Sequence, residues 1–384
     1  MTVDQAHTIL ITGATGYLGS LVAAALAADR SARLVLLIRG KHDPGAVVAH
    51  IRAEAARTGR PQDRHEADRI TVIRMPGAFR AADIVEAVRR FPISEVIHCA
   101  GCLSYWNVAN LNAGNVLLTA ELLAAAARLH VRRFIYLSSA FCSGYLDGPV
   151  SETLHTSPGV DPCPYTASKR DAERLVAESG LPYVMIRPSI VIGDSRNGRY
   201  PGKLSGLYQL LWAARRYLLG RPSVIHAVAP DVPLQLVHQD AFQAGFLAAY
   251  KQLPDNSIMH LVSREETLPT VRQTWGAFVA RYLPECDTRY YDDPSEVATK
   301  QCHGNVRQFL TAVQTNAEIS SHRWRFESTA LDRLRLSGLA FRDASLPTVT
   351  MCQDWFMSTP QRSEVGSAVR DVANALCQQR LSFA

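Results

Sequence analysis

The stretch Thr8-Ile-Leu-Ile-Thr-Gly-Ala-Thr-Gly-Tyr-Leu-Gly19 joins a short apolar run to three glycines near the start of a 384-residue chain. The apolar run predicts a buried strand over 8–12, and the residues after it predict a helix over 17–28. Glycines at these positions allow a tight turn, the close approach of a pyrophosphate and close helix packing, while N–H groups at the helix start bind phosphates. We therefore predict a dinucleotide-binding loop formed by Gly13, Thr15, Gly16, Tyr17, Leu18 and Gly19. The alternative is a glycine-rich turn without a ligand.

The alternation of apolar runs and helical patterns continues through the first half of the chain. Further strands are predicted over 34–38, 70–74, 95–99, 133–138 and 182–187, and further helices over 46–57, 81–90, 110–129 and 165–178. Alternation at this spacing indicates right-handed βαβ units. We therefore expect an α/β fold with a Rossmann-type, doubly wound parallel sheet.

The alternation ends near Gly193. Apolar residues at helical spacing then predict an amphipathic helix over 204–219. Strands predicted over 234–238 and 258–262 are expected to extend the sheet, and the chain after Glu265 reads as mainly helical. We expect a nucleotide-binding domain over 1–193, joined by 233–263, interleaved with a mainly helical substrate-binding domain over 194–232 and 264–384.

The composition indicates an ordinary globular protein. Hydrophobic residues make up 47% and charged residues 20% of the chain, which excludes a disordered or coiled-coil protein. We find neither an apolar run long enough to span a membrane nor a signal-peptide core, so we expect a cytoplasmic protein with reduced cysteines. The pair Cys99 and Cys102 has no second pair to complete a zinc site, and we expect no metal.

The second predicted strand ends in Arg39-Gly-Lys41, and no Asp or Glu occurs from Ser31 to His42. An acidic residue here would bind the ribose 2′-hydroxyl of NAD, whereas a guanidinium suits the 2′-phosphate of NADP. Arg39 therefore predicts NADPH as the cofactor. The alternative is a solvated surface arginine.

Tyr165 and Lys169 lie four residues apart on a predicted helix, which places both side chains on one face. An ammonium beside a phenol can lower its pKa and make the tyrosine a general acid near neutral pH. Ser138 and Ser139 lie at the carboxyl end of the fifth strand, the edge where such sheets bind ligands. A serine here could hydrogen-bond a substrate carbonyl, although serines at strand ends also cap turns.

Together these motifs resemble the extended short-chain dehydrogenase/reductases, with their nucleotide loop and Ser–Tyr–Lys triad. The resemblance selects Ser139, five residues before Gly144, as the triad serine with Tyr165 and Lys169. It also implies cofactor contacts from Tyr165 and Lys169 themselves. Further contacts are implied in three motifs: Val96-Ile-His-Cys-Ala-Gly101, Asn115-Val116 and Arg187-Pro-Ser-Ile-Val-Ile-Gly193. The residues concerned are Ala100, Gly101, Asn115, Pro188, Ser189, Ile190 and Val191.

The chain is most similar to the thioester reductase and fatty-acyl reductase branch, over roughly Ile9 to Leu283. The supporting features are a helical insert after Leu37-Ile-Arg39, the loop from Arg187 to Arg196, and the strand patterns at 236–240 and 260–263. It departs from the family at Met75-Pro-Gly-Ala78, where Gly-Asp is usual, and at Leu118, where glycine is usual.

The resemblance implies NADPH-dependent reduction of an acyl thioester, bound to a carrier protein or to CoA, to an aldehyde or alcohol. Alternatives are a ketone or aldehyde reductase or dehydrogenase, a sugar-nucleotide epimerase, and a non-catalytic NADP-binding sensor. Arg39 argues against the epimerase and the intact triad against the sensor. The resemblance is compatible with a monomer or a homodimer.

The chain carries a net charge of +6, and one stretch from Ser195 to Pro230 has six basic and no acidic residues. Within it, Arg196, Arg199 and Lys203 are candidates for docking an acidic acyl carrier protein at the mouth of an acyl tunnel lined by the 204–219 helix. The alternative is that these side chains pair with carboxylates elsewhere and that the helix packs on the core. Nucleic acid is not expected, because aromatic residues do not interleave with the charges.

Overall fold

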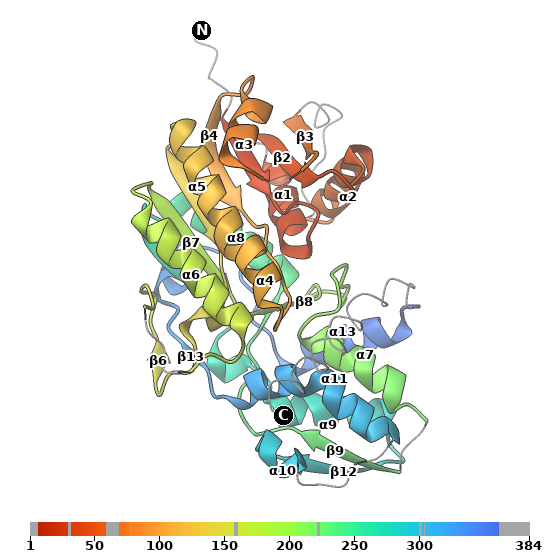
Figure 1. Cartoon of the computed structure of the whole chain (residues 1–384). Coiled ribbons are helices and arrows are strands. Elements are labelled where there is room, and N and C mark those ends of the chain that lie inside the picture. The colour runs from red at the N-terminus through yellow and green to blue at the C-terminus, as the bar shows by residue number, and fades with distance from the viewer. Residues whose placement is uncertain are drawn as a thin grey trace.

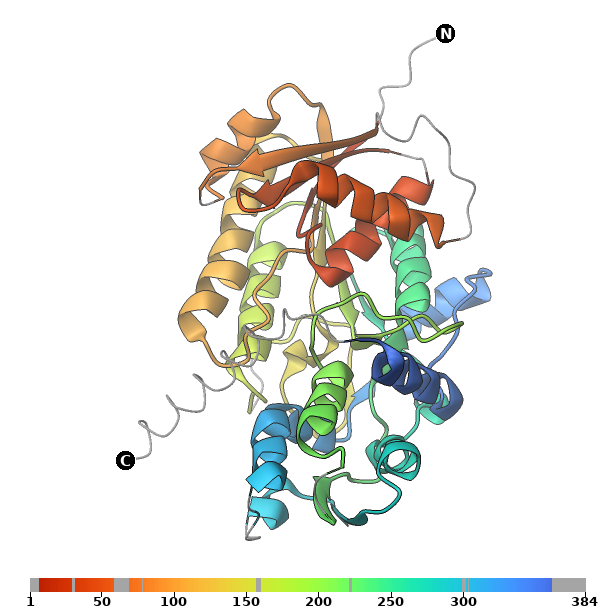
Figure 2. The same ribbon diagram turned by 90° about the vertical axis from the view of Figure 1, so that its right-hand side faces the viewer.

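The computed structural model of the protein describes residues 7–29, 32–58, 69–77, 79–156, 160–220, 223–298, 302 and 304–360. Arg221 of the basic stretch, Ala78 and Cys377 lie outside the described residues. Two lobes are visible in Figure 1 and, turned by 90°, in Figure 2. We call the upper one the nucleotide lobe and the lower one the second lobe.

A seven-stranded parallel sheet forms the centre of the nucleotide lobe, in the order β11-β7-β5-β4-β1-β2-β3. This confirms the predicted α/β, Rossmann-type fold. The strands are β1 (Thr8–Thr12), β2 (Arg33–Arg39), β3 (Ile70–Met75), β4 (Ile93–His98), β5 (Arg133–Leu137), β7 (Tyr183–Pro188) and β11 (Ser257–Leu261). Every residue of β1 is buried, as expected for a central strand that is covered on both faces.

Helices cover both faces of this sheet (Figures 1 and 2). Because side chains alternate along a strand, Ile9 and Ile11 pack into one hydrophobic cluster and Leu10 into another. The first cluster includes side chains from α1 (Tyr17–Asp29), α2 (Pro44–Ala56), α8 (Gln239–Gln252) and α12 (Thr329–Leu336). The second includes side chains from α3 (Ala81–Val88), α5 (Leu118–Arg128) and α6 (Pro164–Glu178).

The second lobe has its own hydrophobic core. Its helices are α7 (Leu207–Tyr217), α9 (Val271–Tyr282), α10 (Pro294–Ala298), α11 (Gly304–Ser321) and α13 (Leu346–Ser358). It also contains a parallel pair, β9 (Val224–Val228) with β12 (Asp287–Tyr291), that the mainly helical prediction missed. Within the described residues, no helix is both long enough and apolar enough to cross a membrane.

Three further predictions differ from the structure. The predicted strand 234–238 is shorter, as β10 (Leu236–His238), and pairs with β8 (Ile190–Ile192) instead of joining the large sheet, which only β11 extends. The predicted helix 204–219 begins later, as α7, because Gly206 has a positive φ of 51° that a right-handed helix excludes. The helix α12, expected in the substrate-binding domain, instead buries Leu331 and Leu334 in the core of the nucleotide lobe.

The short elements near the sheet edge complete the fold. The predicted helix 110–129 consists of α4 (Val108–Leu111), the π-helix η2 (Asn112–Leu117) and α5. The remaining pieces are the 3-10 helices η3 (Ala140–Ser143) and η4 (Glu265–Thr267) and the two-residue strands β6 (Pro149–Val150) and β13 (Arg325–Phe326).

A fully buried ion pair joins α6 to β7. Arg187 donates from Nε to Oε1 of Glu173 at 2.8 Å and from Nη2 to Oε2 at 2.6 Å, and neither side chain is exposed. Further bonds run from Arg187 to the carbonyls of Ser151 and Thr153. Because neither charge is exposed to water, each charge depends on the other for its electrostatic stabilisation.

We predict that Glu173→Gln lowers the free energy of unfolding by about 3–5 kcal/mol, since it leaves a buried guanidinium without its counter-charge. Urea denaturation measures this loss. The control is Asp171→Ala on the same helix, which breaks an exposed pair with Arg174 and is expected to cost less than about 1 kcal/mol. Equal losses in the two variants would contradict the prediction.

Candidate active site

The turn between β1 and α1 brings the backbone of the glycine loop close to its neighbours. Gly13 has a φ of +81°, and a Cβ there would collide with the backbone nitrogen of Ala100. A Cβ on Gly19 would collide with the carbonyl of Gly13. Gly13 in turn accepts a hydrogen bond from the N–H of Gly16 at 2.8 Å. Only glycines fit this close packing, which leaves the N–H groups at the start of α1 accessible to a pyrophosphate.

Ser139, Tyr165 and Lys169 meet at the carboxyl edge of the sheet. Ser139 follows β5 and caps η3, where its hydroxyl accepts from the N–H of Phe141 at 3.3 Å. Tyr165 lies in the first turn of α6 and Lys169 one turn later, so both face the strand ends. Burial has the largest effect on the pKa of the Tyr165 phenol and raises it, and the nearby Ser139 hydroxyl acts in the opposite direction. Lys169 lies one helical turn from Tyr165 and donates to the carbonyl of Leu137, two residues before Ser139, so the three residues lie near the end of β5.

Lys169 is buried beneath this site. Its ammonium donates to the carbonyl of Leu137 at 2.8 Å and lies 4.3 Å from the centre of the Tyr136 ring. Burial lowers the pKa of Lys169 to about 8, although the nearby carboxylate of Glu173 partly opposes this. The group is therefore charged at neutral pH and loses its proton under mildly alkaline conditions.

Burial also raises the pKa of Tyr165 above its ordinary value, and the nearby Tyr105 contributes to the same direction. The expectation that Lys169 lowers this pKa is therefore wrong for this structure, since the ammonium is directed to the Leu137 carbonyl. A raised pKa keeps Tyr165 protonated at neutral pH. A protonated phenol can donate a proton to a developing oxyanion.

The π-helix η2 positions Asn115. Its side chain accepts from the N–H of Cys102 at 2.7 Å and donates to the Cys102 carbonyl at 3.2 Å and to the Ser168 hydroxyl at 2.8 Å. A Cβ on Gly101 would approach the Asn115 oxygen to 2.9 Å. Asn115 therefore fixes the loop that carries Ala100 and Gly101 against α6. π-bulges often occur at functional sites.

The junction of β7 and β8 lies at the carboxyl end of β7, at the same edge of the sheet. Pro188 ends β7, and the N–H groups of Ser189 and Ile190 donate to Leu261 and Gln235 carbonyls. The Ser189 hydroxyl is buried without a hydrogen-bond partner among the described residues. An unsatisfied buried hydroxyl suits a polar ligand atom. Together with the glycine loop, this shows that the residues present fit a dinucleotide.

An aromatic cluster lies beside Tyr165, on the second-lobe side. Phe141 contacts Trp324 edge-on at 5.1 Å between ring centres, and Trp324 stacks on Phe326 at 5.7 Å. Tyr145 and Ile190 pack against the same cluster. The predicted lining of an acyl tunnel by α7 is not observed, because the apolar face of α7 packs into the core of the second lobe. The aromatic cluster packs against Tyr165 instead, and the sequence did not indicate it.

Two groups near the site have structural roles. His98 bonds to the hydroxyls of Thr12 and Thr119 at 2.8 and 3.0 Å, and burial lowers its pKa to about 3. Burial raises the pKa of the Cys99 thiol to about 12, so this thiol is not a reactive thiolate. Among the described residues, no group of three or more His, Cys, Asp or Glu side chains is arranged to hold a metal ion.

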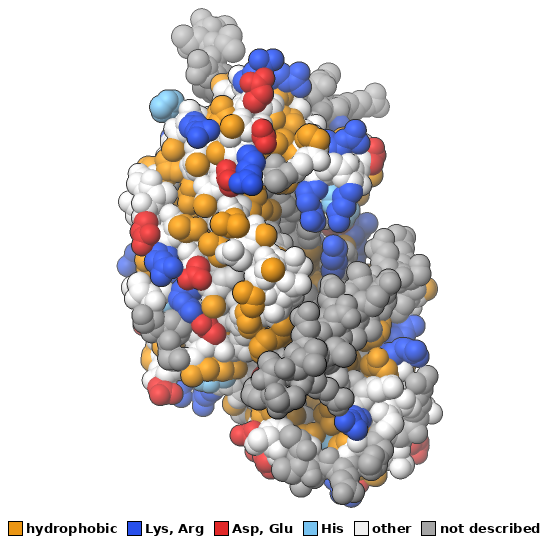
Figure 3. Space-filling model, viewed as in Figure 1, with side chains coloured by type: hydrophobic (Ala, Val, Ile, Leu, Met, Phe, Trp, Pro, Cys, Tyr) orange, Lys and Arg blue, Asp and Glu red, His pale blue; other side chains and the backbone are white. Residues whose placement is uncertain are grey.

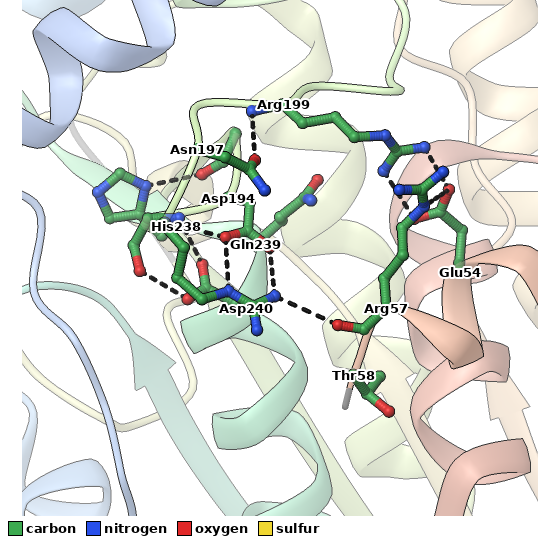
Figure 4. A network of polar contacts seen from close by, with 12 residues as sticks. Glu54, Arg57, Thr58, Asp194, Asn197, Arg199, His238, Gln239 and Asp240 are labelled. Atoms are coloured by element: carbon green, nitrogen blue, oxygen red, sulfur yellow. Dashed lines mark hydrogen bonds and ion pairs between the residues drawn. The ribbon is translucent and has the colours of Figure 1, made fainter. Parts of the chain in front are cut away.

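The basic residues proposed for carrier docking do not form one surface that is free of ion pairs. Arg196 bonds to Asp194 with a shortest distance of 2.6 Å, and Arg199 bonds to Glu54 of α2 at 2.5 and 2.9 Å. The structure therefore corrects the docking prediction in favour of its alternative, pairing with carboxylates. Figure 4 shows Arg199 beside Glu54. Lys203 alone of the three has no carboxylate partner among the described residues.

Comparisons with known proteins agree with this geometry. The terminal R domain from the myxalamid PKS-NRPS biosynthetic pathway has a TM-score of 0.73 at 21% identity, with 94% of each chain covered. A thiolation-reductase di-domain from an archaeal non-ribosomal peptide synthetase has a TM-score of 0.67 at 15% identity, covering 91% of this chain and 75% of that one. UDP-glucuronic acid 4-epimerase from Bacillus cereus, in complex with NAD, has a TM-score of 0.61 at 16% identity, covering 91% and 96%.

No curated protein matches the chain. Residues 9–225, more than half of the chain, match the family model described as the NAD dependent epimerase/dehydratase family. This match confirms the resemblance to the extended short-chain dehydrogenase/reductases, and the chain therefore belongs to the NAD dependent epimerase/dehydratase family.

Proposed function

We propose that the protein is an NADPH-dependent reductase that converts an acyl thioester, bound to a carrier protein or to CoA, to an aldehyde or alcohol. The observation that supports this proposal is the proximity of Ser139 and Tyr165 at the carboxyl end of β5, with Lys169 one helical turn further along α6. A protonated phenol and a serine hydroxyl at one point suit the reduction of a carbonyl.

The reaction divides between the cofactor and the residues of this chain. NADPH, when bound, supplies the hydride. Ser139 and Tyr165 hydrogen-bond the substrate carbonyl oxygen, and Tyr165 gives its proton to that oxygen as negative charge develops. Lys169 binds the cofactor ribose. The hemithioacetal formed from a thioester then loses its thiol and gives the aldehyde, and a second hydride and proton would give the alcohol.

The choice of substrate rests on the structural neighbours, and the choice of cofactor rests on Arg39. The R domain and the thiolation-reductase di-domain have higher TM-scores with this chain than the NAD-bound epimerase has. The exposed Arg39 at the end of β2 favours a 2′-phosphate over the free ribose hydroxyl of NAD. A ketone or aldehyde reductase would use the same three catalytic residues and is the second candidate.

A substrate panel tests the proposal. NADPH oxidation is measured with acyl-CoA and acyl-phosphopantetheine thioesters, ketones and aldehydes at equal concentrations. Turnover of a thioester with release of a free thiol supports the proposal. Turnover of ketones or aldehydes alone would support the second candidate, and NAD-dependent epimerisation without net reduction would contradict both.

We predict that Tyr165→Phe abolishes turnover while NADPH still binds, because the variant keeps the ring and removes the acidic proton. Loss of a general acid lowers a rate by roughly 10²–10⁴. Single-turnover kinetics measure the rate and a fluorescence titration measures NADPH binding. A variant with the wild-type kcat would show that Tyr165 is not the acid.

We predict that the affinity for NADPH falls as the pH rises through about 8, because the pKa of Lys169 is lowered to about 8. The ammonium that binds the ribose exists only below that pH. Losing a charge-assisted hydrogen bond weakens binding by about tenfold. Lys169→Arg keeps its charge and should lose this pH dependence. A wild-type dissociation constant that stays constant from pH 7 to 9.5 would contradict the role of Lys169.

We predict that Arg39→Ala weakens NADPH binding and leaves NADH binding nearly unchanged, because only NADPH carries the 2′-phosphate. A charge-assisted bond to phosphate contributes roughly 1.5–3 kcal/mol, or about 10- to 150-fold in affinity. Titration of both cofactors measures the difference. Equal losses for the two cofactors would instead indicate a general structural effect.

A further inference from the structure

A connection that we call the strap, residues 194–206, links β8 to α7 and crosses from the second lobe to the nucleotide lobe. Arg199 anchors it through two bonds to Glu54 of α2, a carboxylate only 4% exposed. Nη2 of Arg196 donates to the carbonyl of Arg57 at 3.3 Å. Figure 4 shows Arg199, Glu54 and Arg57 at the end of α2. The strap is therefore held against the nucleotide lobe by directed polar contacts.

The middle of the strap packs on the glycine loop itself. The ring of Tyr200 contacts that of Tyr17 at 4.8 Å and stacks on Tyr208 at 3.5 Å between ring centres. A Cβ on Gly202 would lie 2.9 Å from the Tyr17 ring. The Tyr200 hydroxyl donates to the carbonyl of Lys203 at 2.7 Å. These contacts fix the backbone of Lys203 next to the nucleotide-binding turn.

Lys203 lies in the electrostatic field of the residues that follow β2. Burial and the charges of Lys41, Arg39 and Lys203 all lower the pKa of His42. Nε2 of His42 is buried and has no hydrogen-bond partner among the described residues. In Figure 3, basic side chains gather around a histidine on the nucleotide lobe, at the edge that faces the second lobe. The residues after β2 and the strap thus contribute basic groups to one place.

These basic groups are not neutralised inside the protein. Arg39, Lys41 and Lys203 are exposed, and in the part of the chain that the structure describes none of them is in an ion pair, in contrast to Arg196 and Arg199. The nearest carboxylate in sequence, Asp43, accepts the N–H of Ala46 as the N-cap of α2. An uncompensated cluster of cations with an unsatisfied imidazole nitrogen suits a phosphate monoester.

We propose that Lys203, carried by the strap, joins Arg39, Lys41 and His42 in binding the 2′-phosphate of NADPH. This inference rests on the proposed cofactor. It makes Lys203 a residue that determines cofactor specificity, although it belongs to the segment between the two lobes and not to the nucleotide fold. The 3′-phosphate of CoA has the same chemistry, but the position beside the end of β2 and the glycine loop favours the cofactor.

The test uses binding of two nucleotides that cannot react. Adenosine 2′,5′-bisphosphate carries the phosphate of NADPH, and adenosine 3′,5′-bisphosphate carries that of CoA. Calorimetry should show that Lys203→Ala weakens binding of the 2′,5′ isomer by about tenfold or more, leaves NADH binding unchanged and affects the 3′,5′ isomer little. Lys203→Arg should restore much of the affinity. A larger loss for the 3′,5′ isomer would assign the cluster to CoA and overturn the proposal.

The matched control is Arg216→Ala, which removes one exposed positive charge from the same basic stretch and should leave all three affinities unchanged. If the wild type binds NADH as tightly as NADPH, the proposed cofactor is wrong. If the wild type prefers NADPH but Lys203→Ala retains that preference, only the present inference is wrong.

A double-mutant cycle separates contact from positioning. Arg199→Ala releases the strap from Glu54 and should weaken binding of the 2′,5′ isomer through the displacement of Lys203. The losses in the Lys203→Ala, Arg199→Ala double variant should then be less than additive. Fully additive losses would show that the strap does not hold Lys203 at the phosphate and would overturn its part in the proposal.

Discussion

The buried pair of Glu173 and Arg187 is the constraint on which the site depends. Two desolvated charges are tolerated only when each is bonded within the protein, and here the bonds reach β7, α6 and the carbonyls of Ser151 and Thr153. Tyr165, Lys169 and Glu173 follow one another at four-residue spacing, so they share one face of α6. The ion pair that fixes Glu173 therefore also fixes the rotation of α6, and with it the positions of Tyr165 and Lys169, over the sheet edge.

The burial of this site also shifts the pKa values of Tyr165 and Lys169. Burial lowers the pKa of Lys169 and raises that of Tyr165, so both groups shift toward their neutral forms. For a reductase the two shifts have different consequences. A neutral phenol is the form that donates a proton, whereas the lysine must keep its charge to bind a ribose oxygen strongly. The carboxylate of Glu173 raises the pKa of Lys169 and so favours the charged form.

Local patterns in the sequence were sufficient to predict the seven-stranded sheet of the nucleotide lobe, but not that α12 packs on it. The strands are short apolar runs separated by helical segments, and the glycine triplet lies between two adjacent elements. The pairing of β8 with β10, the parallel pair β9–β12 and the bond from Arg199 to Glu54 join residues far apart in sequence. No local pattern encodes such contacts. The π-helix η2 was missed for another reason: it continues the helical periodicity of its neighbours and differs only in its hydrogen bonds.

The basic stretch shows why charge along a sequence differs from charge on a surface. It contains no acidic residue, yet Arg199 finds its carboxylate in the other lobe, and Arg196 pairs with Asp194 just before the stretch begins. Arg199 ties the strap to α2 of the nucleotide lobe, whereas Lys203 has no carboxylate partner among the described residues and can bind a ligand. If that ligand is the 2′-phosphate, a nucleotide carrying it binds better to the docked strap than to a released one. Cofactor choice and lobe docking then share one coupling free energy, and each must strengthen the other equally.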